Sequence, residues 1–197
     1  LVESLARPGG NVTGMSGSNA DLGGKLLALI REAFPRTDRV GVLANATDPF
    51  TAPFLELLEG AQRGAGVSLQ VERVPPDDAY RDAFAAFERH RVQAVIVQPS
   101  LRRERAIALA NAQRLPTASP IGPFAAEGGV LAYAASGAEL RRTLAEYVDR
   151  ILKGAKPADL PVQQPTEFTL VVNVKAARAL GHEIPLSILV RADELIE

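Results

Sequence analysis

The chain has 197 residues and a formal net charge of −1, and 47% of its residues are hydrophobic and 23% charged. These values are typical of a globular protein, and no apolar run approaches the roughly 18 residues that a membrane-spanning helix needs. The basic residues are interspersed with acidic ones, which argues against a nucleic-acid-binding surface. Since there is no cysteine, the sequence excludes disulfide scaffolds, thiol catalysis and thiolate metal sites.

The first residues, LVESLARPGG, lack both an initiator Met and the basic-then-apolar layout of an export signal. We therefore expect that an N-terminal portion precedes Leu1. A turn rich in Gly, Ser and Asn follows. Residues 21–34 then show the amphipathic pattern of one helix, which Pro35 closes.

From residue 39 onward, strand-like and helix-like segments alternate. Strands are expected at residues 39–45, 67–74, 93–98, 115–120 and 130–134, the second of them half-exposed at a sheet edge. Helices are expected at residues 50–64, 79–90, 103–114 and 138–153. This alternation predicts parallel strands joined by right-handed crossovers, so the expected fold class is α/β with an open, doubly wound parallel sheet. An eight-fold barrel would need about 250 residues.

The chain continues after this unit is complete by pattern. We expect one more strand at residues 168–174, a short helix at residues 175–180 and then an extended end. Such a continuation indicates a two-lobed protein. The expected division is residues 1–36 as the remnant of an N-terminal lobe and the start of the hinge, residues 37–155 as an α/β ligand-binding lobe, and residues 156–197 as a crossover that returns toward the N-terminal lobe.

Few residues suit catalysis. The two histidines, His90 and His182, lie at a helix end and in a loop, where a surface or capping role suffices. No serine stands in a nucleophile elbow, no group of side chains has metal-ligand spacing, and the glycine-rich turns lack the phosphate-binding layouts. We therefore expect no catalytic residue, no metal ion and no cofactor, and a binding protein rather than an enzyme.

Hydrogen-bonding side chains and one aromatic ring follow the expected strands. In open α/β sheets, small molecules bind at the carboxyl ends of the strands. A lining of uncharged polar groups suits an uncharged or zwitterionic organic ligand. The same residue types are also good helix N-caps, and that alternative stays open. The candidate ligand-binding residues at these positions are Asn45, Thr47, Gln98, Ser100, Ser119 and Tyr133.

Several segments together resemble a known family. In chain order they are LARPGGNVTGMSG, GGKLLALIREAFP, VGVLANATDP, EGGVLAYAAS, YVDRILKGAKPADLPVQQPTEF and IPLSILVRADELIE. They are similar to ABC-transporter substrate-binding proteins whose better-understood members take up tryptophan and other aromatic amino acids. Family members often have SYGPN where this chain has AYAAS at residues 132–136, so the chemistry of the site, and hence the ligand, differs from that pattern.

The resemblance implies the fold of the type I periplasmic binding proteins, in which two lobes linked by three crossings close on a ligand. The α/β unit would be the C-terminal lobe, flanked by segments of a second, N-terminal lobe that is largely missing. Residues 11–16, residues 154–164 and the stretch after them are the implied crossings. Tyr133 would stack on a planar ligand, with Phe50 and Phe124 as further candidates, and Ser16 would contact it from the hinge side.

The function implied by the resemblance is that of a periplasmic or extracytoplasmic solute-binding protein. It would bind a small organic, amino-acid-like solute, dock on an ABC permease in the membrane, contact no nucleic acid and be monomeric when complete. The effector-sensing domain of a transcription regulator shares this architecture and is the alternative. A helix-turn-helix upstream would favour regulation, whereas an export signal would favour transport, and the C-terminal segments resemble the transport proteins.

Overall fold

The computed structural model describes residues 2–16, 21–75 and 79–197. The chain forms two compact units, of which unit 1 comprises Leu1–Asn19 and Ala135–Phe168, and unit 2 comprises Ala20–Ala134 and Thr169–Glu197. The chain therefore passes three times between the units. Residues 154–164, expected as a crossing, lie inside unit 1, and the later crossing falls at Phe168 and Thr169. The expected 156–197 stretch is thus shared between the two units.

A seven-stranded sheet with the order β2-β1-β3-β4-β5-β6-β7 organises unit 2. Its first five strands pair in parallel, which confirms the predicted α/β fold class. The half-exposed strand β2 lies at one edge, as its alternating sequence predicts. The strands are β1 (Arg39–Asn45), β2 (Ser68–Val74), β3 (Ala94–Val97), β4 (Thr117–Ser119), β5 (Leu131–Ala135), β6 (Phe168–Asn173) and β7 (Glu194–Ile196).

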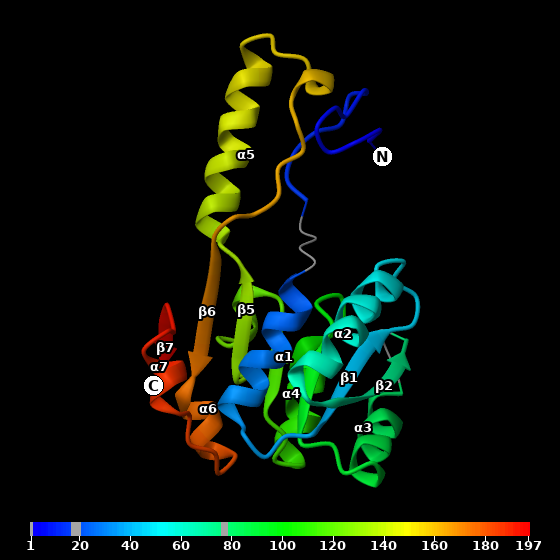
Figure 1. The fold of residues 1–197 in the computed structure, drawn as a ribbon, viewed down its shortest axis with the longest axis vertical. Helices are drawn as coiled ribbons and strands as arrows, with labels where there is room; N and C mark the ends of the chain where they lie inside the picture. Colours follow the sequence, from blue (N-terminus) through cyan, green and yellow to red (C-terminus); the bar gives the residue numbers. More distant parts are fainter. Residues whose placement is uncertain (1, 17–20, 76–78) are drawn as a thin grey trace. The chain divides into compact units, whose positions relative to one another are not determined.

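Helices cover both faces of this sheet (Figure 1). Apolar residues of one strand alternate between the faces: Val42 joins the cluster formed with α1, α2, α6 and α7, while Leu43 joins the cluster formed with α3, α4 and the 3-10 turn η1. No helix in the described ranges combines the length and apolar character that crossing a bilayer requires. The bounds are α1 (Asp21–Ala33), α2 (Thr51–Ala65), α3 (Tyr80–Arg89), α4 (Arg103–Ala112), η1 (Gly122–Phe124), α6 (Val174–Ala179) and α7 (Leu186–Leu189).

The last two strands of the sheet run against the first five. Asn173 N–H donates to Val130 O at 2.8 Å, and Figure 1 shows the arrows of β5 and β6 pointing in opposite directions. Strand β7 then pairs in parallel with β6. The prediction of an extended end was wrong, because the short helix α7 turns the chain back to the sheet, where Asp193 Oδ2 accepts a hydrogen bond from Leu170 N–H at 2.7 Å.

Unit 1 is built on the long helix α5 (Gly137–Leu152), followed by the 3-10 turn η2 (Pro157–Asp159) and an extended segment. Ser136 Oγ accepts from Glu139 N–H at 3.3 Å, so Ser136 is the N-cap of α5. The extended segment pairs with the N-terminal residues, since Val162 N–H donates to Leu5 O at 2.7 Å and Ser16 N–H donates to Gln163 O at 2.8 Å.

Helix α5 buries polar side chains and exposes apolar ones. Its buried face carries Glu139, Thr143 and Tyr147, which lie four residues apart. Its apolar residues Val148 and Leu152 are 56% and 82% exposed. Hydrogen bonds tie this buried face to the extended segment, because Glu139 accepts from the N–H groups of Thr166 and Glu167 and the Tyr147 hydroxyl donates to Pro161 O.

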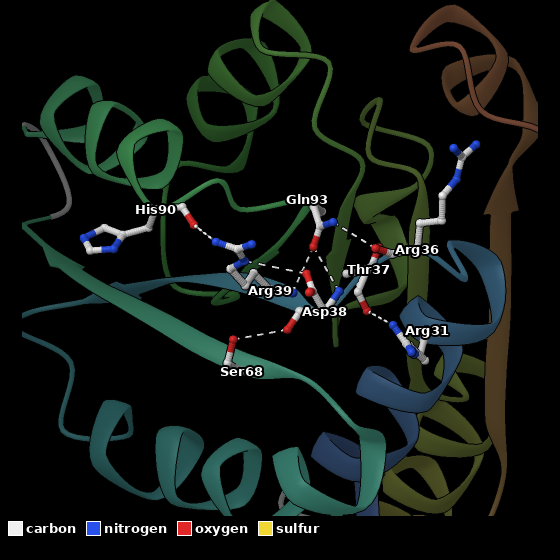
Figure 2. A network of polar contacts seen from close by, with 8 residues as sticks. All are labelled: Arg31, Arg36, Thr37, Asp38, Arg39, Ser68, His90 and Gln93. Atoms are coloured by element: carbon white, nitrogen blue, oxygen red, sulfur yellow. Dashed lines mark hydrogen bonds and ion pairs between the residues drawn. The ribbon is translucent and has the colours of Figure 1, made fainter.

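A polar network closes the turn between α1 and β1 at the amino end of the sheet (Figure 2). Gln93 Oε1 accepts from Asp38 N–H at 2.9 Å and from Arg39 N–H at 3.0 Å, and Gln93 Nε2 donates to Arg36 O at 2.8 Å. The only ion pair drawn there, Asp38 with Arg39 at 3.6 Å, is largely exposed. This network orders a connection at the amino ends of the strands, whereas the predicted binding residues lie at the carboxyl ends.

Candidate functional site

The structure brings four of the predicted site residues together at the carboxyl ends of β1 and β3. These strands pair in parallel with Leu43 opposite Val97, so the residues that follow them lie side by side beyond the carboxyl ends of the strands. One set of hydrogen bonds then connects Asn45, Thr47, Gln98 and Ser100. The sequence predicted parallel strands, and the pairing of β1 with β3 in the structure is what places these residues side by side.

Gln98 is the centre of this set, although its side chain is only 1% exposed. Its Oε1 accepts from Asn45 N–H at 2.8 Å and from Thr51 Oγ1 at 2.9 Å. Its Nε2 donates to Asp48 Oδ2 at 3.0 Å. Because two donors occupy Oε1, the orientation of the amide is fixed and Nε2 must face Asp48.

Asn45 is also buried, at 5% exposure, and uses its polar atoms within the protein. Its Oδ1 accepts from both the N–H and the hydroxyl of Thr47 at 3.0 Å, and its Nδ2 donates to Ser100 Oγ at 3.3 Å. Thr47 and Ser100 are themselves exposed. The buried amides therefore hold two exposed hydroxyls in place at the strand ends.

Asp48 is a member of this network that is not among the predicted site residues, since a carboxylate just before a helix has the ordinary explanation of an N-cap. Its half-buried carboxylate accepts from Phe50 N–H at 2.8 Å through Oδ1 and from Gln98 through Oδ2. Hydrogen bonds from the Ser100 hydroxyl, the Phe50 N–H and Gln98 lower its pKa from the ordinary value. The carboxylate is thus ionised at neutral pH.

Three predicted residues lie outside this network or connect to it differently. Ser119 is fully buried and its Oγ donates to Val97 O at 2.7 Å, which joins the ends of β4 and β3. Tyr133 is half-buried and packs against the apolar cluster on the α1 side, where burial raises the pKa of its hydroxyl. Ser16 belongs to unit 1. Of the further aromatic candidates, Phe50 is 43% exposed, whereas Phe124 is a fully buried core residue.

A hollow of about 380 Å³ lies next to Ser100, at the start of α4. Arg103 and Glu127 form an ion pair beside it. Arg103 Nε donates to Glu127 Oε2 at 2.6 Å, and Arg103 Nη2 donates to Glu127 Oε1 at 2.7 Å. This pairing lowers the pKa of Glu127 and raises that of Arg103. None of the predicted site residues lines the hollow, whose lining is mostly charged and comes from the start of α4 and the segment after η1: Leu101, Arg102, Arg103, Glu104, Arg105 and Glu127.

Comparison with solved structures finds the same fold in bacterial proteins. Over 98% of its length the chain is similar to a conserved domain protein from Vibrio cholerae, with 26% identity and a TM-score of 0.88. Over 99% of its length it is similar to an ABC domain from Streptococcus pneumonia solved in complex with L-Trp, with 26% identity and a TM-score of 0.86. The chain spans 66% of the first protein and 68% of the second.

A third similar structure is the ligand-free, open form of CD0873 from Clostridium difficile, described as a substrate-binding protein with adhesive properties. It is 19% identical over 100% of this chain and 66% of its own, with a TM-score of 0.74, and supports the fold. A search of curated proteins found no match. Residues 1–196 match the family described as ABC transporter substrate binding protein. The chain therefore belongs to the family of ABC transporter substrate-binding proteins.

Proposed function

We propose that this protein is the extracytoplasmic solute-binding component of an ABC uptake transporter and that it binds a small organic, amino-acid-like solute in an interlobe cleft. The observation that carries the proposal is the hydrogen-bonded network of Asn45, Gln98 and Asp48 at the carboxyl ends of β1 and β3, in a member of this family. An ordered polar edge of this kind is where open α/β sheets bind small molecules.

The predicted site residues take two roles in this proposal. The exposed hydroxyls of Thr47 and Ser100 contact the solute, and Tyr133 stacks against it. The buried Asn45, Gln98 and Ser119 hold these groups in position. Ser16 stays a proposed contact. These roles follow from exposure, because a buried amide whose polar atoms are already bonded has little left to offer a ligand.

An aromatic amino acid is the first solute to test, because the similar Streptococcus pneumonia structure contains L-Trp. The family implies an ABC permease as the membrane partner. Closure of two hinged lobes around the solute would present a distinct docking form to that permease. Since the chain spans about two thirds of its similar structures, the activity of the whole protein, including a complete N-terminal lobe, is part of the proposal.

A thermal-shift screen with amino acids, des-amino acids and sugars tests the proposal, followed by calorimetry on each hit. A solute that binds only the folded state stabilises it by about 2.7 kcal/mol at a hundredfold excess over Kd, which raises Tm by several degrees. Ser100→Ala should weaken binding, whereas Ser68→Ala, at the amino end of β2, should not. An unchanged Tm with every solute would refute the proposal.

A further inference from the structure

The carboxylate of Asp48 is held by more than the bond that starts α2. Its Oδ2 is bonded by the amide of Gln98, a side chain that is 1% exposed and whose orientation is fixed by Asn45 N–H and Thr51 Oγ1. A residue that only starts a helix needs no more than the bond to Phe50 N–H at 2.8 Å. The buried amide therefore fixes the carboxylate beyond what the helix start requires.

In the described part of the chain, the charge of this carboxylate is not balanced by a cationic side chain. Its three donors, the Phe50 N–H, the Gln98 amide and the Ser100 hydroxyl, are all neutral. Among the residues that the structure describes, no Lys, Arg or His forms an ion pair with Asp48. An ionised carboxylate can accept about four hydrogen bonds, so a site for a further donor remains.

The surroundings of Asp48 combine this negative charge with an apolar surface. The Phe50 ring follows two residues later and is 43% exposed, which leaves it accessible to a ligand. The exposed hydroxyl of Thr47 precedes Asp48 at the same strand end. A cationic amine with an apolar body would satisfy both the charge and the ring, whereas a sugar or a carboxylate would leave the charge unpaired.

We propose that Asp48 is a specificity-determining residue that accepts the ammonium group of the solute, and that Gln98 is the positioning residue that fixes its carboxylate. The solute class is then amino acids and related primary amines, not their des-amino counterparts. This inference rests on the proposed solute-binding function and narrows it to ligands that carry a cationic amine.

Calorimetry with matched pairs of ligands tests the inference. The pairs are L-tryptophan with 3-indolepropionate, L-phenylalanine with 3-phenylpropionate, and L-leucine with 4-methylpentanoate. Because a charge-assisted hydrogen bond is stronger than a neutral one, the wild-type protein should prefer the amine of a pair by about 10- to 100-fold. Asp48→Asn, which keeps the shape, should remove that preference. Asp38→Asn, just before the amino end of β1, is the matched control and should keep the preference for the amine.

The outcomes separate this inference from the proposed function. A wild-type protein that binds an amino acid and its des-amino partner equally, or that binds a solute without an amine more tightly than every amino acid, overturns the role of Asp48 alone. An Asp48→Asn protein that keeps the preference does the same. A wild-type protein that binds no solute of the screen overturns the function and this inference together. Since the wild-type preference needs no variant, poor folding of Asp48→Asn would still leave a decisive result.

Discussion

Gln98 Nε2 donates to Asp48 Oδ2 at 3.0 Å and thereby joins the end of β3 to the loop that follows β1. The two residues lie fifty positions apart in the sequence, and the parallel pairing of their strands brings them together. The same amide accepts two further bonds through Oε1, so one buried side chain holds the turn before α2.

Gln98→Leu should therefore destabilise the protein by about 2–3 kcal/mol, because the buried Asn45 N–H loses its acceptor and the Asp48 carboxylate loses a donor. Urea unfolding followed by circular dichroism measures this change. Gln70→Leu is the matched control, since Gln70 is half-buried and its amide bonds only the neighbouring Glu72. Equal loss in the two variants would contradict the central role of Gln98.

Glu139 should make the stability of the protein depend on pH. Hydrogen bonds from the Thr166 hydroxyl, then from the Glu167 and Thr166 N–H groups, lower its pKa in the folded state. The unfolded chain therefore binds the proton more tightly, and the stabilisation is present above the unfolded pKa of about 4.3 and lost as the pH falls below it through the lower folded pKa.

Urea midpoints between pH 7 and pH 3 test this dependence. Glu139→Gln should be less stable than wild type at pH 7, and the difference should shrink in the acid range. Glu146→Gln lies on the exposed face of the same helix and should change neither value. A constant difference between wild type and Glu139→Gln across this range would be inconsistent with the assignment.

Removing the hydroxyl of Thr117 should stabilise the folded protein. The residue is 1% exposed in β4, and its Oγ1 finds no hydrogen-bond partner in the described part of the chain. Thr117→Val keeps the shape and removes a buried, unbonded oxygen, so we expect stabilisation by about 1 kcal/mol. Thermal unfolding measures it, with Ser119→Ala as the contrasting variant, because Ser119 Oγ is bonded to Val97 O and its loss should destabilise. Lower stability of Thr117→Val would show that the oxygen has a partner.

Arg114 ends α4 in a left-handed conformation that favours glycine. Its φ is 55°, and Leu115 N–H donates to Ala110 O across it, the bond that closes a helix C-terminus. Because Arg114 is exposed, Arg114→Gly should stabilise the protein by about 0.5–1 kcal/mol. Ala108→Gly, on the exposed side of the same helix, should have the opposite sign and cost about 1 kcal/mol. The two melting temperatures measure both effects, and the same sign for both would argue against relief of strain.

The fold could be predicted wherever local patterns and packing agree. Strand β1 has the predicted bounds, because its continuous apolar run is buried on both faces. Ser136 caps α5 as its sequence indicates. The end of the chain could not be predicted, since β7 has only three residues and its pairing with β6 depends on contacts distant in sequence. A local pattern contains no information on such a partner.

The candidate site was predicted in its location more than in its chemistry. The strand assignment predicts that Asn45, Thr47, Gln98 and Ser100 follow strand ends, but the pairing of β1 with β3 that brings them together was not predicted. Asp48 was missed because a carboxylate before a helix has an adequate local explanation. Only the buried amide of Gln98, fifty residues away, distinguishes it from an ordinary cap.

The antiparallel pairing of β5 and β6 has a consequence for protein engineering. Asn173 N–H bonds Val130 O, so Ala134, four residues after Val130, stands opposite Thr169, four residues before Asn173. The polypeptide between them, residues 135–168, leaves the α/β unit and returns to the neighbouring strand. A two-residue Asn-Gly hairpin could replace this whole excursion and yield a minimal, separately expressible sheet domain.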